Sequence, residues 1–233
     1  MTKLSVAIII PALNEAKVID ASIRRAWDSG CDEVIVVDGG SEDDTVSISE
    51  KMECRVIHSE RGRGNQLNAG SAAANSDVLL FMHADNWLAK DGCQQICQQM
   101  ENDQHLEYGG FLQSILNDHW MYRWIEYGNA QRVYWRGLLY GDQGLFVRRR
   151  LFERTGGFPN IPIMEDLEFS RVLKKIGRAK LLTGPIYVDA RRWTQHGLIR
   201  QTLRNWYLSS AYLCGASPNW LAGKYRNHDL DGS

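Results

Sequence analysis

Residues 5–15 read SVAIIIPALNE, an apolar and β-branched run that ends at a proline and then at polar side chains. Three further runs of this kind follow at 33–37, 54–58 and 78–82 (EVIVV, CRVIH and VLLFM). Short, continuously apolar runs separated by stretches of helical composition are typical of βαβ units, in which helices cover both faces of a parallel sheet. The sequence therefore predicts an α/β fold with a single, mainly parallel sheet flanked by helices.

The spacing of apolar residues also predicts the remaining elements and the organisation of the chain. Helices are expected between the first strands, at 15–28, 43–52 and 64–75. Past residue 100 we expect strands at 109–115 and 144–148 and helices at 118–133, 165–176 and 198–214. One large domain should cover residues 1–200, with halves at 1–116 and 117–200, and a C-terminal helix and tail should cover 201–233.

Charge and composition exclude several classes of protein. The 233 residues include 27 lysines and arginines against 28 aspartates and glutamates, a formal net charge of −1, so a nucleic acid is not an expected partner. Residues 1–116 carry 9 basic and 18 acidic residues, a net −9, whereas residues 117–233 carry 18 and 10, a net +8. The basic half suits an anionic acceptor or an anionic membrane surface, and solvated helix faces are the simpler alternative.

The expected location is the cytoplasm. The N-terminal sequence meets Pro11 and charged residues before it has the length of a signal peptide, and the longest apolar runs are far shorter than the roughly 20 residues of a membrane-spanning helix. Five scattered cysteines argue for reduced thiols, and the i, i+4 pair Cys93 and Cys97 is interpreted as buried core rather than as a metal site.

Polar residues and glycines follow each of the first four expected strands. These segments are Pro11 to Glu15, Asp38 to Ser41, Arg61 to Gln66 and His83 to Asp85. Ligands of open α/β sheets bind outside the carboxyl ends of the strands, so the four segments should meet around one nucleotide. Arg61 and Arg63 offer guanidinium groups to a diphosphate, although such a loop is more often simply solvated. The glycine patterns of dinucleotide-binding folds and P-loops are absent.

Two acidic segments are candidates for chemistry. In His83-Ala84-Asp85, a carboxylate just past a buried strand suits a divalent metal, Mg²⁺ or Mn²⁺, and His83 is either a further ligand or a structural histidine. Glu165 and Asp166 stand at the expected start of a helix after a loop at 156–162. They are either a capping pair or a site in which one carboxylate takes a proton from an attacking hydroxyl.

Together these segments resemble glycosyltransferase family 2, whose members have a GT-A fold with a Rossmann-like sheet. The resemblance runs from about residue 5 to about residue 200. The strings that carry it are PALNEA (11–16), VVDGGSEDDT (36–45), RGRGNQLNAG (61–70), FMHADN (81–86), YGDQGLFVRR (140–149), GGFPNIPIMEDLEFSRVLKKIG (156–177) and RRW (191–193). The combination of FMHADN, YGDQG and RRW is especially similar to a small bacterial subgroup linked with arsenosugar-type biosynthesis.

The resemblance implies roles for individual residues. Its nucleotide-sugar contacts fall on these positions: Pro11, Asn14, Glu15, Asp38, Arg61, Arg63, Gln66, Asp142, Arg192 and Trp193. Asp85 matches the metal-binding Asp of the family's Asp-x-Asp element, and Asp166 matches the general base, with Glu165 orienting groups beside it. His83 replaces the first Asp of that element, and His196 is either a further metal ligand or a solvated loop histidine.

The implied reaction is the transfer of one sugar, with inversion, from a nucleotide sugar to a hydroxyl of a small-molecule or lipid-linked acceptor. A UDP-sugar is the expected donor. Two alternatives stay open: a sugar nucleotidyltransferase, which usually has a glycine-rich basic loop after its first strand, and a non-catalytic module that binds a nucleotide sugar.

Aromatic residues gather in the second half. Trp120, Trp124 and Tyr127 fall at i, i+4 and i+7, and we expect this stripe to be core. The amphipathic segment at 202–216 (TLRNWYLSSAYLCGA) has basic flanks. It would dock on a membrane surface, at the inner face of the membrane, or on a second copy in a homodimer, or pack on the sheet.

Overall fold

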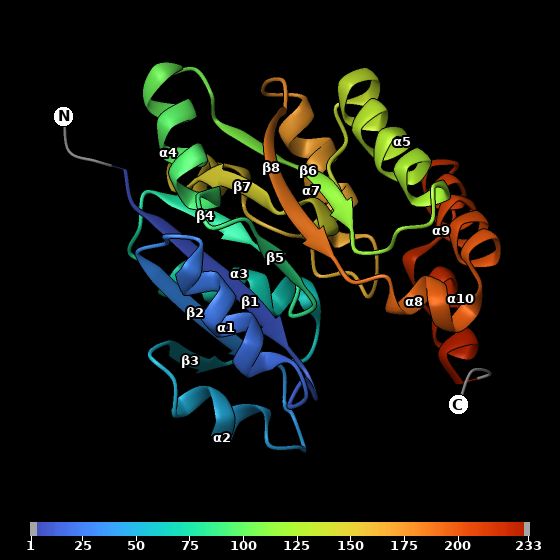
Figure 1. The fold of residues 1–233 in the computed structure, drawn as a ribbon, viewed down its shortest axis with the longest axis horizontal. Helices are drawn as coiled ribbons and strands as arrows, with labels where there is room; N and C mark the ends of the chain where they lie inside the picture. Colours follow the sequence, from blue (N-terminus) through green and yellow to red (C-terminus); the bar gives the residue numbers. More distant parts are fainter. Residues whose placement is uncertain (1–3, 231–233) are drawn as a thin grey trace.

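The computed structural model describes residues 4–230 and shows a mixed α/β fold built on one curled sheet (Figure 1). The strand order across the eight-stranded sheet is β3-β2-β1-β4-β7-β6-β8-β5. The strands are β1 (Val6–Ala12), β2 (Glu33–Asp38), β3 (Arg55–His58), β4 (Val78–Phe81), β5 (Asn86–Leu88), β6 (Tyr108–Ile115), β7 (Leu145–Arg148) and β8 (Lys180–Val188). The α/β prediction is therefore confirmed.

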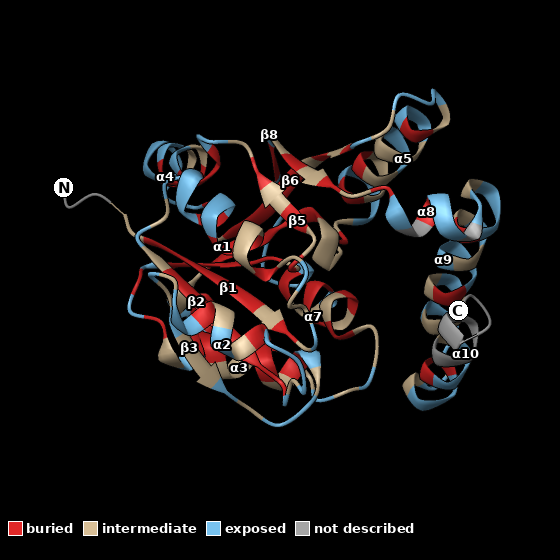
Figure 2. Ribbon diagram, turned by 60° about the horizontal axis from the view of Figure 1, so that its bottom comes forward, coloured by how far each residue is buried: buried red, intermediate tan, exposed pale blue. Residues whose placement is uncertain are grey.

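Helices cover both faces of this sheet and extend past one end of it. They are α1 (Ile19–Asp28), α2 (Thr45–Glu50), α3 (Arg63–Ala73), α4 (Gly92–Asn102), α5 (Met121–Arg136), the 3₁₀ turn η1 (Gly141–Gln143), α6 (Arg149–Thr155), α7 (Glu165–Lys174), α8 (Arg191–His196), α9 (Leu198–Leu213) and α10 (Pro218–Leu230). Both views place α8, α9 and α10 at the end of the molecule opposite the N-terminus (Figures 1 and 2).

The parallel character of the sheet is concentrated in the first half of the chain. β1 pairs in parallel with β2 and β4, and β2 pairs in parallel with β3. β7 then runs antiparallel to both β4 and β6, while β6 and β8 are parallel and β5 closes the edge antiparallel to β8. The mainly parallel sheet predicted from the sequence thus describes β1 to β4, and the second half is mixed.

Alternation along β1 explains why its sequence is apolar throughout. Ile8 and Ile10 pack in one core cluster with Ile19 and Ile23 of α1, whereas Ile9 belongs to a second cluster on the opposite face. That second cluster includes residues of α3, α6 and α7. Both faces of the strand are therefore buried. Because side chains alternate between the two faces, every position along the strand is apolar. Figure 2 shows the central strands as buried and the outer helix faces as exposed.

Two expectations about side chains have different outcomes. Cys93 and Cys97 are buried free thiols in the core, as predicted. The aromatic stripe on α5 is not core, because Trp120, Trp124 and Tyr127 are 64%, 66% and 59% exposed. The helix was predicted correctly, but its buried residues are Tyr122, Ala130 and Val133, which lie on a different face. Among residues 4–230, no helix combines the length and the apolar character needed to cross a membrane.

Gly70 of α3 offers a test of the packing between helix and sheet. A Cβ at this position would lie 2.4 Å from Ile9 Cγ2 and 2.9 Å from Val37 Cγ2. We expect Gly70→Ala to lower the free energy of unfolding by about 1–3 kcal/mol, since overpacking outweighs the better helix propensity of alanine.

The matched control is Gly128→Ala in α5, where an added Cβ would meet nothing within 4 Å. This variant should be neutral or gain up to about 1 kcal/mol from helix propensity. Urea denaturation of both variants gives the comparison, and equal stabilities would contradict the proposed close approach of α3 to β1.

Candidate active site

The loops after β1 and β2 are hydrogen-bonded to one another at the carboxyl ends of the strands. Asn14 adopts a positive φ of 56°, and its backbone N–H donates to Ser41 Oγ at 2.9 Å. Its side-chain Oδ1 accepts from the Glu42 N–H at 2.9 Å, and the Glu15 N–H donates to Thr45 Oγ1 at 2.8 Å. The structure therefore brings the first two predicted segments together, since parallel strands end at the same edge.

Asp38 shapes the second of these loops. Its carboxylate accepts hydrogen bonds from the backbone N–H groups of Gly40 and Ser41, each at 3.0 Å, and lies 3.3 Å from His58 Nδ1. Burial opposes ionisation, but the hydrogen bonds from Ser41, Gly40 and His58 together hold the pKa of Asp38 below its usual range. An ionised, fully ordered carboxylate is thus present at the end of β2.

Gln66, predicted to contact the nucleotide sugar, has a structural role in the protein. The side chain is buried, and its Nε2 donates to the carbonyl oxygens of Ala12 at 2.8 Å and Val37 at 2.9 Å. Both amide hydrogens are therefore used to tie the ends of β1 and β2 to α3. The buried amide stabilises the loops after β1 and β2, against which a ligand would bind.

The arginine-glycine segment contacts the later half of the chain. Arg61 is exposed, whereas Arg63 opens α3 and places Nη1 3.4 Å from Glu165 Oε1. A Cβ on Gly64 would lie 2.5 Å from the carbonyl oxygen of Pro159, so only glycine allows α3 to approach the 156–162 loop this closely. The segment thus joins the nucleotide-side loops to the start of α7.

Glu165 and Asp166 occupy different environments at the start of α7. Met164 precedes them in a left-handed conformation, with φ of 69°, which turns the chain into the helix. Glu165 is 3% exposed, and burial raises its pKa although Arg63 opposes the shift. Asp166 is partly accessible, and its carboxylate accepts from the Gly141 N–H at 2.5 Å and from the Leu167 N–H at 2.7 Å. Asp166 is therefore the carboxylate that reaches a surface.

The η1 turn rests on a half-buried arginine that sequence reasoning missed. Arg132 of α5 donates to Gln143 Oε1 at 2.7 Å and to Asn129 Oδ1 at 3.0 Å, and its guanidinium stacks 3.5 Å from the centre of the Tyr140 ring. Burial lowers the pKa of Arg132, against the attraction of Tyr140, Asp142 and Asp166. Burial also raises the pKa of Asp142, and Arg132 counteracts that shift. The turn that presents Gly141 and Asp142 is thus held from beneath.

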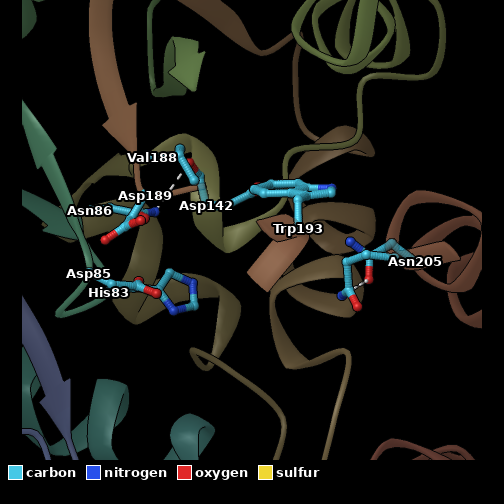
Figure 3. A pocket seen from close by; sticks show the side chains of 9 residues that line it. His83, Asp85, Asn86, Asp142, Val188, Asp189, Trp193 and Asn205 are labelled. Atoms are coloured by element: carbon cyan, nitrogen blue, oxygen red, sulfur yellow. Dashed lines mark hydrogen bonds between the residues drawn. The ribbon is translucent and has the colours of Figure 1, made fainter. Parts of the chain in front are cut away.

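Two recesses meet at His83. A shallow hollow, hereafter the hollow, is lined by Pro11, Arg63, His83, Gly141 and Asp166 together with apolar residues. A cavity of about 100 Å³, hereafter the cavity, lies beside it. Its lining residues are His83, Asp85, Asn86, Asp142, Val188, Asp189, Trp193, Gln201 and Asn205 (Figure 3). Since His83 lines both recesses, a group bound in the hollow would lie next to one bound in the cavity.

The metal-binding residues predicted from the sequence are brought together only in part. His83 and Asp85 line the cavity from the segment after β4. Arg191 Nη2 lies 3.9 Å from Asp85 Oδ2, and Arg191 Nε lies 2.9 Å from Asp189 Oδ2. No cluster of three or more His, Cys, Asp or Glu side chains arranged to hold a metal occurs among the described residues. Arg192 and His196 are on α8, and their side chains lie outside the described part of the chain.

Several residues around the cavity carried no sequence signal. Gln201 lies outside every quoted string, Asp189 stands two residues before RRW, and Asn86 ends FMHADN, but none of the three was assigned a role. Asn86 Nδ2 donates to the Asp142 carbonyl oxygen at 3.4 Å, and Gln113 Nε2 donates to the same oxygen at 3.2 Å. These amides acquire their role only from the pairing of β5, β6 and β8 around η1.

Several proteins of known sequence are similar to this chain over most of its length. The chain is 28% identical over 183 residues to the glycosyltransferase YfnE of Bacillus subtilis (strain 168), covering 73% of this chain and 46% of that one. It is 26% identical over 210 residues to a PGL/p-HBAD biosynthesis glycosyltransferase of Mycobacterium bovis (strain BCG / Pasteur 1173P2), covering 84% and 79%. The chain thus spans about half the length of the first relative and most of the second.

Solved structures show the same fold. The mannosyltransferase PcManGT from Pyrobaculum calidifontis, in complex with GDP-Man and Mn²⁺, superposes with a TM-score of 0.69 at 20% identity, covering 94% of this chain and 67% of that one. TarS 1–349 of S. aureus, in complex with UDP-GlcNAc, gives a TM-score of 0.65 at 19% identity, covering 80% and 58%. The family model for glycosyl transferase family 2 matches residues 7–156. The chain belongs to glycosyl transferase family 2 and has the GT-A fold of these structures.

Proposed function

We propose that the protein is a metal-dependent, inverting glycosyltransferase that moves one sugar from a nucleotide sugar to a hydroxyl of an acceptor. The observation that carries the proposal is the meeting of the hollow and the cavity at His83, with the Asp166 carboxylate held by two N–H donors at that junction. Membership of the family and the nucleotide sugars bound by PcManGT and TarS support a nucleotide-sugar donor, of which a UDP-sugar remains the expected kind.

The nucleotide would bind against the interlocked loops at the ends of β1 and β2. Pro11, Asn14, Glu15 and Asp38 form this surface, and Arg61 and Arg63 stand at the start of α3. Guanidinium groups there would neutralise the oxygens of the diphosphate. We assign Arg192 of α8 to the diphosphate side of the same substrate and Trp193 to the boundary between donor and acceptor, since the Arg-Arg-Trp string resembles a motif that lies close to both.

A divalent cation, Mn²⁺ or Mg²⁺, suits the donor groups at the end of β4. Asp85 offers hard oxygen ligands and His83 an imidazole, and two protein ligands are enough where substrate phosphates supply others. When bound, the cation would stabilise the negative charge of the leaving diphosphate. His196 is proposed as a further ligand on the strength of the motif alone.

Asp166 is the proposed general base. Its carboxylate is oriented by the Gly141 and Leu167 N–H groups and faces the hollow, so one oxygen is positioned to take the proton of an attacking hydroxyl. Glu165 is buried against Arg63 and would position the start of α7. Asp142, on the turn that Arg132 supports, would hold groups on the acceptor side.

Three finer assignments rest on motifs. The strings FMHADN, YGDQG and RRW support membership of the subgroup linked with arsenosugar-type biosynthesis. The sugar domain would cover 1–200, with a nucleotide-binding half at 1–116 and an acceptor half at 117–200, and 201–233 would extend it. The first loop, Pro-Ala-Leu-Asn-Glu, argues against a nucleotidyltransferase, which leaves a non-catalytic binding module as the rival.

Measurements of donor binding and donor hydrolysis distinguish the proposed metal ligand, Asp85, from the proposed general base, Asp166. With UDP- and GDP-sugars, we expect Mn²⁺ to strengthen binding in thermal-shift titrations and Asp85→Asn to weaken it at least tenfold. Asp166→Asn should bind donor but lower its hydrolysis, in which water replaces the acceptor, by about 10²–10⁴-fold, as expected for loss of a general base.

The control for both variants is Asp28→Asn, an exposed position at the end of α1. Full hydrolysis by Asp166→Asn would refute the base assignment. Metal-dependent binding without turnover in the unaltered protein, with acceptors supplied, would favour the binding module.

The burial of Glu165 has a consequence for stability. A carboxyl whose pKa is raised in the folded state stabilises the protein below its unfolded pKa, near 4.3, and this contribution is lost as pH rises through the folded pKa. We therefore expect the free energy of unfolding of Glu165→Gln, measured against the unaltered protein, to rise between pH 4 and pH 8.

The second variant is Arg63→Gln, which removes the cation that opposes the shift. It should make the loss of stability with rising pH steeper. A pH-independent difference for Glu165→Gln would show that this carboxyl has the same pKa in both states.

A further inference from the structure

The cavity gathers buried polar atoms that have no partner within the protein. Six such side-chain atoms occur among the described residues, and three belong to residues that line the cavity: Asp142 Oδ1, Trp193 Nε1 and Gln201 Oε1. Trp193 is 9% exposed and Gln201 4%. Each buried atom left without a hydrogen bond costs about 1–3 kcal/mol, so three around one cavity indicate a site that a ligand completes.

The three groups are held in place by other contacts. The Trp193 ring packs edge-on against Tyr122, with centroids 6.0 Å apart. Gln201 Nε2 donates to Asn205 Oδ1 at 3.1 Å, which leaves its Oε1 to accept from another group. The backbone of Asp142 is fixed by Gln113 and Asn86. A ligand would therefore meet a preformed set of groups and would not have to order them.

The chemistry of these groups selects hydroxyls. Asp142 Oδ1 and Gln201 Oε1 accept hydrogen bonds, and Trp193 Nε1 donates one. A hydroxyl does both, so a molecule with several hydroxyls satisfies all three atoms. The cavity of about 100 Å³ is several times the space that a single water needs.

The charge around the cavity disfavours an anion. Asp85, Asp142 and Asp189 line it, no lysine or arginine whose side chain the structure describes does, and the nearby Arg191 is paired with Asp189. The charge of these described residues thus opposes the interpretation of the basic second half as a site for an anionic acceptor.

We propose that the cavity is the acceptor subsite and takes an uncharged, hydroxyl-rich molecule, with Gln201 and Trp193 as its specificity-determining residues. This inference rests on the proposed glycosyltransferase function. The reacting hydroxyl would lie on the His83 side, next to Asp166, and the remaining hydroxyls would reach Gln201 and Trp193.

The test compares neutral polyols with anions of similar size. Glycerol, myo-inositol and methyl glucoside should raise donor consumption above hydrolysis, whereas glycerol 3-phosphate and 3-phosphoglycerate should not. Gln201→Leu should raise the KM of the neutral acceptor at least tenfold with little change in kcat, and Gln201→Glu, which keeps the accepting oxygen, should restore most of the loss.

Trp193→Phe, which keeps the ring and removes the N–H, should raise the same KM and guards against a folding defect in the first variant. Gln195→Leu, at an exposed position on α8, is the matched control. Turnover of anionic acceptors only, or an unchanged KM in both variants, would overturn the subsite. Failure of any nucleotide sugar to bind would instead refute the proposed function.

A separate observation concerns the outer face of α9. Ile199, Leu203, Trp206 and Tyr207 fall at i, i+4, i+7 and i+8, and all four are between 57% and 61% exposed. They form an apolar stripe on the described surface, and on α10 Trp220 is also exposed, at 46%, with its ring centre 5.9 Å from Lys224 Nζ. Such a stripe needs a partner.

Charge identifies the partner. The sequence has no aspartate or glutamate between Asp189 and Asp229, a stretch that carries six lysines and arginines. Among those whose side chains are described, Arg200 of α9 and Lys224 of α10 are exposed, whereas Arg191 is paired with Asp189 and Arg204 contacts Tyr225. Aromatic and aliphatic residues flanked by cations are the composition of helices that lie in the interface of an anionic bilayer. We infer that the outer face of α9 and α10 docks on an anionic lipid surface.

Sedimentation with vesicles tests this surface. Binding should be strong with phosphatidylcholine containing 30% phosphatidylserine and weak with phosphatidylcholine alone. The double variant Leu203→Ser with Trp206→Ser should lower partitioning at least tenfold, while Trp27→Ser on α1 should not. Equal binding to both vesicle types, or none, would overturn the inference, as would a dimer that the double variant dissociates.

Discussion

The antiparallel register of β7 against β4 determines where the site forms. Phe81 at the end of β4 pairs with Leu145 at the start of β7. The segment that leaves β4, with His83 and Asp85, therefore lies at the same edge as the η1 turn that enters β7. A parallel pairing would have put Gly141 and Asp142 at the far edge of the sheet. The contact of Gly141 with Asp166 depends on this reversal of direction.

Buried charge at this junction is costly and is compensated locally. Glu165 is buried and Arg132 and Asp142 are half-buried, and their removal from water shifts each pKa towards the neutral form. Arg132 and Asp142 attract one another, and Arg63 lies beside Glu165. Such groups add little to stability compared with an apolar core. Their cost is consistent with a junction shaped for chemistry, where conformation and charge outrank stability.

The sequence allowed the fold to be predicted from β1 to β4, because each strand there is a local apolar run and each loop follows it directly, whereas β5 and α4 were missed. β8 was missed since Gly184 and Pro185 interrupt its apolar pattern, and the pairing with β6 shifts register between Phe111 and Gln113. The helix at α5 was predicted but its buried face was not. Periodicity shows that a helix has an apolar stripe and does not show which neighbour covers it.

For the candidate site too, residues in local motifs were predicted and residues that depend on distant partners were not. Asp38, Asp85 and Asp166 stand in recognisable local contexts, and the structure places them at one edge of the sheet. Gln66 was predicted to contact the nucleotide sugar, and its side chain also links the ends of β1 and β2, while Arg132 and Gln201 gain their roles only from partners distant in sequence. The local spacing of residues does not predict side-chain roles that depend on tertiary contacts.

The two outermost strands of the sheet, β3 and β5, affect how the protein behaves at high concentration. An edge strand offers unpaired backbone groups to other chains, and long apolar edges promote intermolecular β-pairing. Here β5, at one edge, has only three residues, and β3, at the other, begins with Arg55 and ends with His58, both exposed. The strands that are apolar throughout lie inside the sheet. The shortness of β5 and the polar, exposed ends of β3 thus disfavour aggregation through addition of strands from other chains.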